Sequence, residues 1–90
     1  MSKLDEARLI INECDKELIN IFKKRMNAAK LVAEYKKENN LPILDKKRED
    51  EIVKKNVLLL NDSTLEQYYL EFFKSMLKVS KDYQSKLNED

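Results

Sequence analysis

The 90-residue chain has no glycine, no histidine, one proline and one cysteine. Because tight turns and sheets rely on glycine for positive φ angles, its absence favours long helices with few connections. It also excludes the glycine-rich phosphate loops of P-loop nucleotidases and Rossmann dinucleotide enzymes. With no histidine and only one cysteine, the chain cannot form a Ser-His-Asp or Cys-His relay or an ordinary zinc site. Any chemistry at neutral pH must therefore use carboxylates, lysines, arginines and amides.

An excess of charge of one sign is also missing, since 18 Lys and Arg stand against 17 Asp and Glu. Nucleic-acid-binding proteins of this size are usually strongly basic, so this balance argues against such a partner. No apolar run approaches the ~20 residues of a membrane-spanning helix, and residues 1–11 lack the apolar core of a signal peptide. The lone Cys14 cannot form an internal disulfide, which fits a reducing compartment. We therefore expect a cytoplasmic, stand-alone protein that binds neither nucleic acid nor membranes.

Apolar residues recur at three- and four-residue steps along three segments, which turn-like stretches at 39–42 and 61–63 separate. The first segment predicts one amphipathic helix from about Leu4 to about Lys37. Two shorter helices follow it. We therefore predict one domain over residues 1–90 with an all-α fold of one long and two shorter helices.

Capping residues predict where the two shorter helices begin. Asp45 can cap the second helix with its carboxylate. The buried stripe of that helix is expected to consist of Ile52, Val53, Val57 and Leu60. Ser63 and Glu66 are three residues apart and predict a capping box at the start of the third helix.

The predicted first helix is longer than a compact domain of this size. It spans about 50 Å at 1.5 Å per residue, whereas a compact chain of this length has a diameter of roughly 30 Å. Its apolar stripe continues along the overhang and would be exposed in a single chain. The sequence therefore predicts a two-fold homodimer in which the long helices pack together and the short helices wrap around the other subunit.

Cationic residues interrupt the apolar stripe of the first helix. Arg25 lies on this stripe, and Lys36 returns to within about 20° of it, ~16 Å further along the axis. Two long side chains can close this gap around a small molecule. Arg8 lies ~25 Å from Arg25 and roughly 100° around the helix, too far to share a site within one chain. In an antiparallel dimer, Arg8 of one chain can lie beside the later part of the other helix.

The two shorter helices add further polar candidates. Ser80 and Gln84 continue the buried line of the third helix, where a hydroxyl and an amide each need a partner. Arg48 and Glu49 lie one turn before the buried stripe of the second helix, close to Asp45 and to free backbone N–H groups. With the cations of the first helix they form a constellation that suits a small molecule with more than one carboxylate.

Most of these side chains also have a purely structural interpretation. Arg48 can be a solvated residue, and Glu49 can pair with a lysine at a neighbouring helical position. Ser80 can be a tolerated small residue, and Gln84 can face water. Seven other lysines are assigned to solvated faces, namely Lys23, Lys24, Lys37, Lys54, Lys55, Lys78 and Lys81.

Taken in order, the candidate residues resemble the all-helical chorismate mutases, the AroQ class. The resemblance rests on Arg8, Ile11, Asp15, Leu18, Arg25, Ala29, Lys36, Pro42, Ile43, Asp45, Arg48, Glu49, Ser80 and Gln84. Its most specific portion is the Arg-x10-Lys pair followed by Asp-x-x-Arg-Glu and, near the end, Ser-x3-Gln. Asn12 and Cys14 depart from the family pattern, at positions that the family does not use for substrate.

The resemblance implies an intertwined homodimer with two sites, each completed by the partner subunit's Arg8. The family's reaction is the Claisen rearrangement of chorismate to prephenate, on the route to phenylalanine and tyrosine. It is unimolecular, so the resemblance implies no metal and no cofactor. Arg8 and Arg25 would bind the two substrate carboxylates, with Arg48 and Ser80 assisting.

The remaining roles that the resemblance implies concern the ether oxygen and the ring hydroxyl of chorismate. Lys36 and Gln84 would donate hydrogen bonds to the ether oxygen, which gains negative charge in the transition state. Glu49 would accept a hydrogen bond from the ring hydroxyl, with help from the backbone near Asp45.

Two alternatives stay open at the level of sequence. Isochorismate-pyruvate lyases are similar in fold and use a comparable cationic pocket for a related dianion. A non-catalytic helical dimerisation or regulatory module would carry the same charges merely as solvated residues. The Asp45 to Glu49 segment favours the mutase over the lyase, and binding of a dicarboxylate would separate an enzyme from a dimerisation module.

Overall fold

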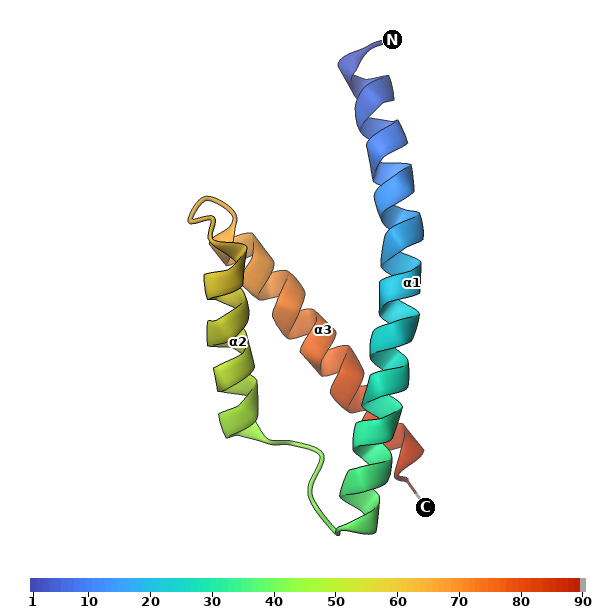
Figure 1. The fold of residues 1–90 in the computed structure, drawn as a ribbon, viewed down its shortest axis with the longest axis vertical. Coiled ribbons are helices and arrows are strands. Elements are labelled where there is room, and N and C mark those ends of the chain that lie inside the picture. Colours follow the sequence, from blue (N-terminus) through green and yellow to red (C-terminus); the bar gives the residue numbers. More distant parts are fainter. Residues whose placement is uncertain (90) are drawn as a thin grey trace.

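The computed structural model describes residues 1–89 as three helices, α1 (Lys3–Glu38), α2 (Lys46–Leu60) and α3 (Glu66–Leu87). Helix α3 packs on both of the others, against α2 as far as Lys81 and against α1 toward its own end (Figure 1). The N-terminal half of α1 extends beyond this junction without a neighbouring helix (Figure 1). The predicted all-α fold of one long and two shorter helices is confirmed.

Helix α1 is continuous over 36 residues, and its bounds agree within one residue with those predicted from the sequence. Its start is held by a capping box, in which the Asp5 N–H donates to Ser2 Oγ over 3.1 Å and the Ser2 N–H donates back to the Asp5 carboxylate. The longest dimension of the chain is 56 Å and its radius of gyration is 16.4 Å, whereas a compact chain of this length would have a radius of about 12 Å. A single subunit is therefore elongated, as the helix length predicts.

The buried core is small and lies where α3 crosses α1. Among the described residues, the buried side chains are Ala29, Ala33, Phe73, Ser80 and Gln84. The two alanines present almost no side chain, which lets α3 come close to α1. Helix α2 covers the other side of α3 with a half-buried stripe, and this stripe consists of the predicted Ile52, Val53, Val57 and Leu60.

Two asparagines provide the left-handed backbone that glycine would normally supply. Asn40 has φ 55° in the connection after α1, and Asn61 has φ 48° at the end of α2. Asparagine tolerates this region better than other residues that carry a Cβ atom. The chain therefore makes both of its turns without glycine.

The starts of α2 and α3 test the two predicted caps. The Arg48 N–H donates to Asp45 Oδ1 over 3.1 Å, so the predicted cap of α2 is confirmed. The predicted capping box of Ser63 with Glu66 is wrong, because α3 has no side-chain cap. Asp62 acts one residue earlier, and its Oδ1 accepts from the Thr64 N–H at 2.9 Å and from the Thr64 hydroxyl at 2.6 Å.

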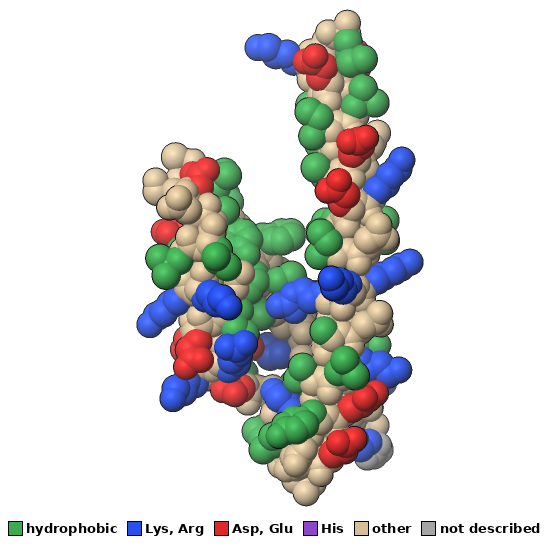
Figure 2. Space-filling model, in the orientation of Figure 1, with side chains coloured by type: hydrophobic (Ala, Val, Ile, Leu, Met, Phe, Trp, Pro, Cys, Tyr) green, Lys and Arg blue, Asp and Glu red, His purple; other side chains and the backbone are tan. Residues whose placement is uncertain are grey.

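The free half of α1 carries large apolar side chains that residues 1–89 leave about half exposed. Leu9, Ile10, Ile11, Leu18, Ile19, Ile21 and Phe22 are between 48% and 63% exposed. Figure 2 shows hydrophobic side chains along this half of α1 and on α3 beside the opening between the two helices. A strip of this size is unusual for a monomer in water. No helix among the described residues is long and apolar enough to cross a membrane.

Candidate active site

A polar cavity of about 440 Å³ lies between the second half of α1, the start of α2 and the end of α3. It is lined by seven of the eight site residues predicted from the sequence, namely Arg25, Lys36, Asp45, Arg48, Glu49, Ser80 and Gln84. Its apolar wall consists of Ala28, Ala29, Val32, Ile43, Ile52 and Leu77, and Lys81 completes the lining. Residues up to 59 positions apart in the chain therefore meet around one space.

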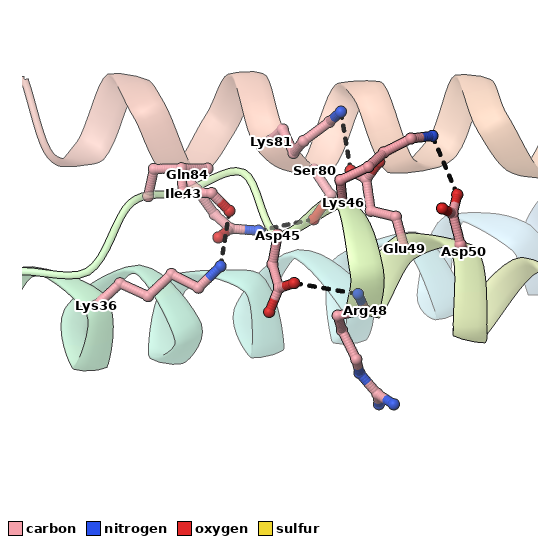
Figure 3. Close-up of polar contacts among 10 residues, drawn as sticks. All are labelled: Lys36, Ile43, Asp45, Lys46, Arg48, Glu49, Asp50, Ser80, Lys81 and Gln84. Atoms are coloured by element: carbon pink, nitrogen blue, oxygen red, sulfur yellow. Dashed lines mark hydrogen bonds and ion pairs between the residues drawn. The ribbon is translucent and has the colours of Figure 1, made fainter.

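Lys36 reaches the polar cavity from the last turn of α1. Its Nζ atom donates to the backbone carbonyl of Ile43 over 2.7 Å, and the side chain is half-buried (Figure 3). This bond ties the ammonium to the connection between α1 and α2. Because an ammonium has three donors, others remain for a ligand in the cavity.

Ser80 and Gln84 form the α3 side of the polar cavity, and each is only 7% exposed. Gln84 Nε2 donates to Ser80 Oγ over 3.2 Å, whereas Gln84 Oε1 is buried with no hydrogen-bond partner among residues 1–89 (Figure 3). A buried amide oxygen without a partner is costly. The amide is therefore held in place but not fully satisfied by the protein, as expected of a group that binds a ligand.

Helix α2 contributes its first turn to the polar cavity. The Asp45 carboxylate is engaged in capping the helix, and Arg48 is exposed, with a guanidinium that extends away from Glu49 (Figure 3). Glu49 is half-buried, and its Oε1 lies 2.8 Å from the Nζ atom of Lys81 on α3. The first turn of α2 thus places the Glu49 carboxylate and the long cationic side chain of Arg48 at the polar cavity.

Lys81 was assigned to a solvated face from the sequence, and this assignment is wrong. The residue is half-buried, lines the polar cavity and pairs with Glu49 across the α2–α3 interface. Its spacing of four residues from the inward-facing Leu77 is the signal that would have placed it there. The other six lysines assigned to solvated faces are exposed.

A second lysine near Glu49 is engaged elsewhere. Lys46 Nζ lies 3.0 Å from Asp50 Oδ1 in an exposed pair. The hydrogen bond that Lys46 donates to the Asp50 carboxylate, followed by the negative charge of that carboxylate, raises the pKa of Lys46 above the ordinary value of 10.5. Lys46 therefore stays charged at neutral pH but is directed at Asp50, and Lys81 is the partner of Glu49.

The charges around the polar cavity favour an anion. Arg25, Lys36, Arg48 and Lys81 stand against the carboxylates of Asp45 and Glu49. This excess of positive charge in a concave space attracts a negatively charged ligand. Arginine also matches the planar geometry of a carboxylate. The lining therefore fits a small molecule with two carboxylates and further polar oxygens.

Arg8 is the one predicted site residue that does not line the polar cavity. It lies on the free half of α1 and is exposed, ~25 Å from Arg25 along the helix axis. Arg25 itself borders a second, apolar cavity of about 620 Å³ between α1 and α3. This apolar cavity is lined mainly by Leu18, Ile21, Phe22, Phe72, Met76 and Val79. A second chain lying in it would pass directly beside Arg25.

Comparison with known proteins gives one match. Residues 7–85 match the model of a family described as chorismate mutase type II, and this range contains all eight predicted site residues. No curated protein and no solved structure matches the chain.

Proposed function

Because the chain belongs to the chorismate mutase type II family, we propose that the polar cavity is its active site and that the partner subunit's Arg8 completes it. The chain is an isomerase that converts chorismate to prephenate. The observation that supports this location is the meeting of Arg25, Lys36, Glu49 and Gln84, from three helices, around one cavity. The reaction is unimolecular, so catalysis consists of holding a reactive conformer and stabilising the charge that develops on it.

Arginines bind the two carboxylates of chorismate in this proposal. Arg25 binds one carboxylate from the wall of the polar cavity, with Ser80 as a neighbouring hydroxyl. The partner subunit's Arg8 binds the other. Arg48 is exposed and long enough to turn back toward the cavity, where it assists. A charged, bidentate donor pair on each carboxylate fixes the substrate in a folded conformation.

Lys36 and Gln84 act on the ether oxygen, whose bond to carbon breaks in the rearrangement. This oxygen becomes more negative in the transition state, so a donor aimed at it stabilises the transition state more than the substrate. The Lys36 ammonium is already oriented by Ile43. The Gln84 amide nitrogen uses one N–H in the 3.2 Å bond to Ser80 and has a second N–H for the substrate. Both donors are therefore in place before the substrate binds.

Glu49 accepts a hydrogen bond from the ring hydroxyl of chorismate. Its carboxylate lines the polar cavity and is held at one oxygen by Lys81. The backbone at Asp45, where α2 begins, lies at the same end of the cavity. This contact distinguishes the hydroxyl-bearing face of the substrate ring from the other face.

The proposed homodimer follows from the surface that one subunit leaves uncovered. The exposed apolar strip on α1 and the apolar cavity between α1 and α3 are adjacent and of the same character. In a two-fold dimer, the free half of each α1 would fill the apolar cavity of the other subunit. Arg8 of that helix would then reach the neighbourhood of Arg25, which borders both cavities.

Continuous ultraviolet measurement of chorismate consumption, with identification of the product, tests the activity. We expect prephenate at a rate far above the spontaneous one, and no comparable turnover of isochorismate. Formation of pyruvate and salicylate from isochorismate, with little prephenate from chorismate, would identify a lyase instead. The proposed cytoplasmic location is tested separately, by fractionation of cells that produce the protein.

The shared site is tested by mixing two inactive variants. Arg8→Ala and Arg25→Ala each damage both sites of a pure dimer. When the two variants are refolded together in equal amounts, half of the dimers are mixed, and each mixed dimer holds one intact site. We therefore expect recovery of about a quarter of the wild-type activity. Recovery would not occur if Arg8 served a site in its own chain, and either variant refolded alone serves as the control.

A further inference from the structure

The ion pair between Lys81 and Glu49 differs from two ion pairs that lie within single helices. It joins α3 to α2, its N–O distance is 2.8 Å, and the two side chains are 34% and 19% exposed. The pairs Lys46 with Asp50 and Lys78 with Asp82 each lie within one helix, with all four side chains more than half exposed. Exposed pairs contribute little to stability, whereas a half-buried pair between helices fixes two side chains relative to each other.

The position of this pair connects it to the proposed active site. Both residues line the polar cavity, and both also border a third cavity of about 450 Å³ between α2 and α3. The pair is therefore shared by the lining of these two cavities. Lys81 directly follows Ser80, whose side chain is buried in the same cavity.

The charge of Glu49 is unfavourable for the substrate unless something offsets it. Chorismate carries two carboxylates, and a carboxylate of the protein in the same cavity repels both of them. The arginines are occupied with the substrate, and Lys46 is directed at Asp50. Lys81 contacts Glu49 Oε1, which leaves Oε2 as the acceptor for a substrate hydroxyl.

We propose that Lys81 is a positioning residue for chorismate binding, which holds the Glu49 carboxylate toward the substrate hydroxyl and offsets its charge against the dianionic substrate. This inference rests on the proposed function, because it assumes that Glu49 contacts the substrate. Lys81 acts through Glu49 and does not itself touch the breaking ether bond. The interaction is present in the substrate complex and in the transition state alike. Its loss therefore raises KM and leaves kcat nearly unchanged.

The test compares Lys81→Met with Lys78→Met by steady-state kinetics. Both variants lose one positive charge and one ion pair on α3, but the pair of Lys78 with Asp82 is exposed and outside the polar cavity. We expect Lys81→Met to raise KM about tenfold with kcat within about twofold. Lys78→Met keeps wild-type constants, and Lys81→Arg, which retains the charge, restores KM to within about threefold of wild type.

A double-mutant cycle with Glu49→Gln separates this inference from the proposed function. Glu49→Gln replaces a charged acceptor of the substrate hydroxyl with a weaker, neutral one and removes the charge next to the substrate, so KM or kcat changes if Glu49 contacts the substrate. Wild-type kinetics in this variant would remove the assumption itself. If Lys81 acts through Glu49, adding Lys81→Met to Glu49→Gln raises KM no further. Additive losses would overturn the positioning role, and so would equal KM values for Lys81→Met and Lys78→Met. A fall in kcat that tracks a lowered unfolding temperature, with no rescue by Lys81→Arg, would show a structural role instead.

Discussion

The Nζ atom of Lys36 donates a 2.7 Å hydrogen bond to the backbone carbonyl of Ile43, which ties the end of α1 to the connection that leads into α2. The proposed hydrogen-bond donor to the ether oxygen is therefore held in place by the chain itself. Preorganised charge of this kind costs little reorganisation when negative charge develops on a substrate.

Replacement of Lys36 should slow the chemical step more than it weakens binding. We expect Lys36→Met to lower kcat by about 100-fold to 1,000-fold, as loss of one preorganised donor does in other enzymes. Lys30→Met, on the exposed side of the same helix, should keep wild-type kcat. A wild-type kcat in Lys36→Met would remove this residue from the proposed mechanism.

The apolar cavity predicts which substitutions separate the subunits. Phe72 is 55% exposed and lines this cavity, so a charge there should prevent a second helix from entering it. We expect Phe72→Glu to elute as a monomer in size-exclusion chromatography at micromolar concentration and to lose activity. Leu58, which is 78% exposed on α2 and lies outside the apolar cavity, provides the control. A Phe72→Glu protein that elutes with the wild type, as Leu58→Glu should, would contradict the proposed interface.

Asp45 and Ser63 were both predicted to cap a helix, but in the structure only Asp45 does so, and this predicts different effects of their replacement on stability. Asp45→Ala removes the acceptor of the Arg48 N–H and should cost ~1 kcal/mol of unfolding free energy. Ser63→Ala removes no helix cap and should change it by much less. Urea denaturation, with an unchanged dependence on denaturant concentration, measures both. Equal losses in the two variants would mean that Ser63 caps α3 in solution.

Asp62 predicts a contribution to stability that depends on pH. Hydrogen bonds from the Thr64 hydroxyl and then from the Thr64 N–H lower the pKa of Asp62 below its ordinary value of 3.8. A carboxyl group with a lowered pKa in the folded state stabilises that state above the ordinary pKa, and this contribution is lost as the pH falls through the folded-state value. The difference in unfolding temperature between wild type and Asp62→Asn should therefore be constant above about pH 5 and shrink below pH 3.8. A difference that grows on acidification would contradict this.

Asn88 links the end of α3 to α1 and should support the position of Gln84. Its Nδ2 atom donates to the backbone carbonyl of Ala33 over 3.0 Å, one turn beyond Gln84. Asn88→Ala should cost ~1 kcal/mol of stability and lower kcat/KM about tenfold, because a small misplacement of a donor is costly in a preorganised site. Asn56→Ala removes a similar bond, from Asn56 Nδ2 to the Ile52 carbonyl, within α2. It should lower stability alone, and a matching loss of kcat/KM in both variants would show a general effect of destabilisation.

The long helix and most of the candidate site were predictable because both depend on helical periodicity. The spacing of eleven residues fixes the relation of Arg25 to Lys36 without knowledge of the fold. The spacing of four places Ser80 and Gln84 on one face in the same way. Because each pair shares one face of its helix, packing of α1 against α3 brings both pairs to the polar cavity.

Features that depend on the approach of two helices were not predictable in this way. The spacing from Leu77 places Lys81 on the inward face of α3, but the pairing of Lys81 with Glu49 depends on the angle at which α3 crosses α2, which no periodicity within α3 determines. The start of α3 was misplaced for a different reason, since Asp62 and Ser63 are both good turn acceptors. The observed acceptor is Asp62, one residue before the predicted Ser63, and it accepts hydrogen bonds from Thr64.

Because α1 is one unbroken helix, it fixes the distance between Arg8 and Arg25. In the proposed dimer, Arg8 completes the site of the partner subunit, whereas Arg25 lines the site of its own subunit. No proline interrupts this helix between Arg8 and Arg25, so these two residues stay ~25 Å apart along the helix axis. One residue inserted into it would advance Arg8 by only 1.5 Å but would rotate it by about 100° about the axis. In the proposed dimer that rotation turns Arg8 away from both active sites at once, whereas the connection at residues 39–45 can absorb an insertion locally. In the proposed dimer, the number of residues in α1 is therefore as important for catalysis as the identity of the side chains that it carries.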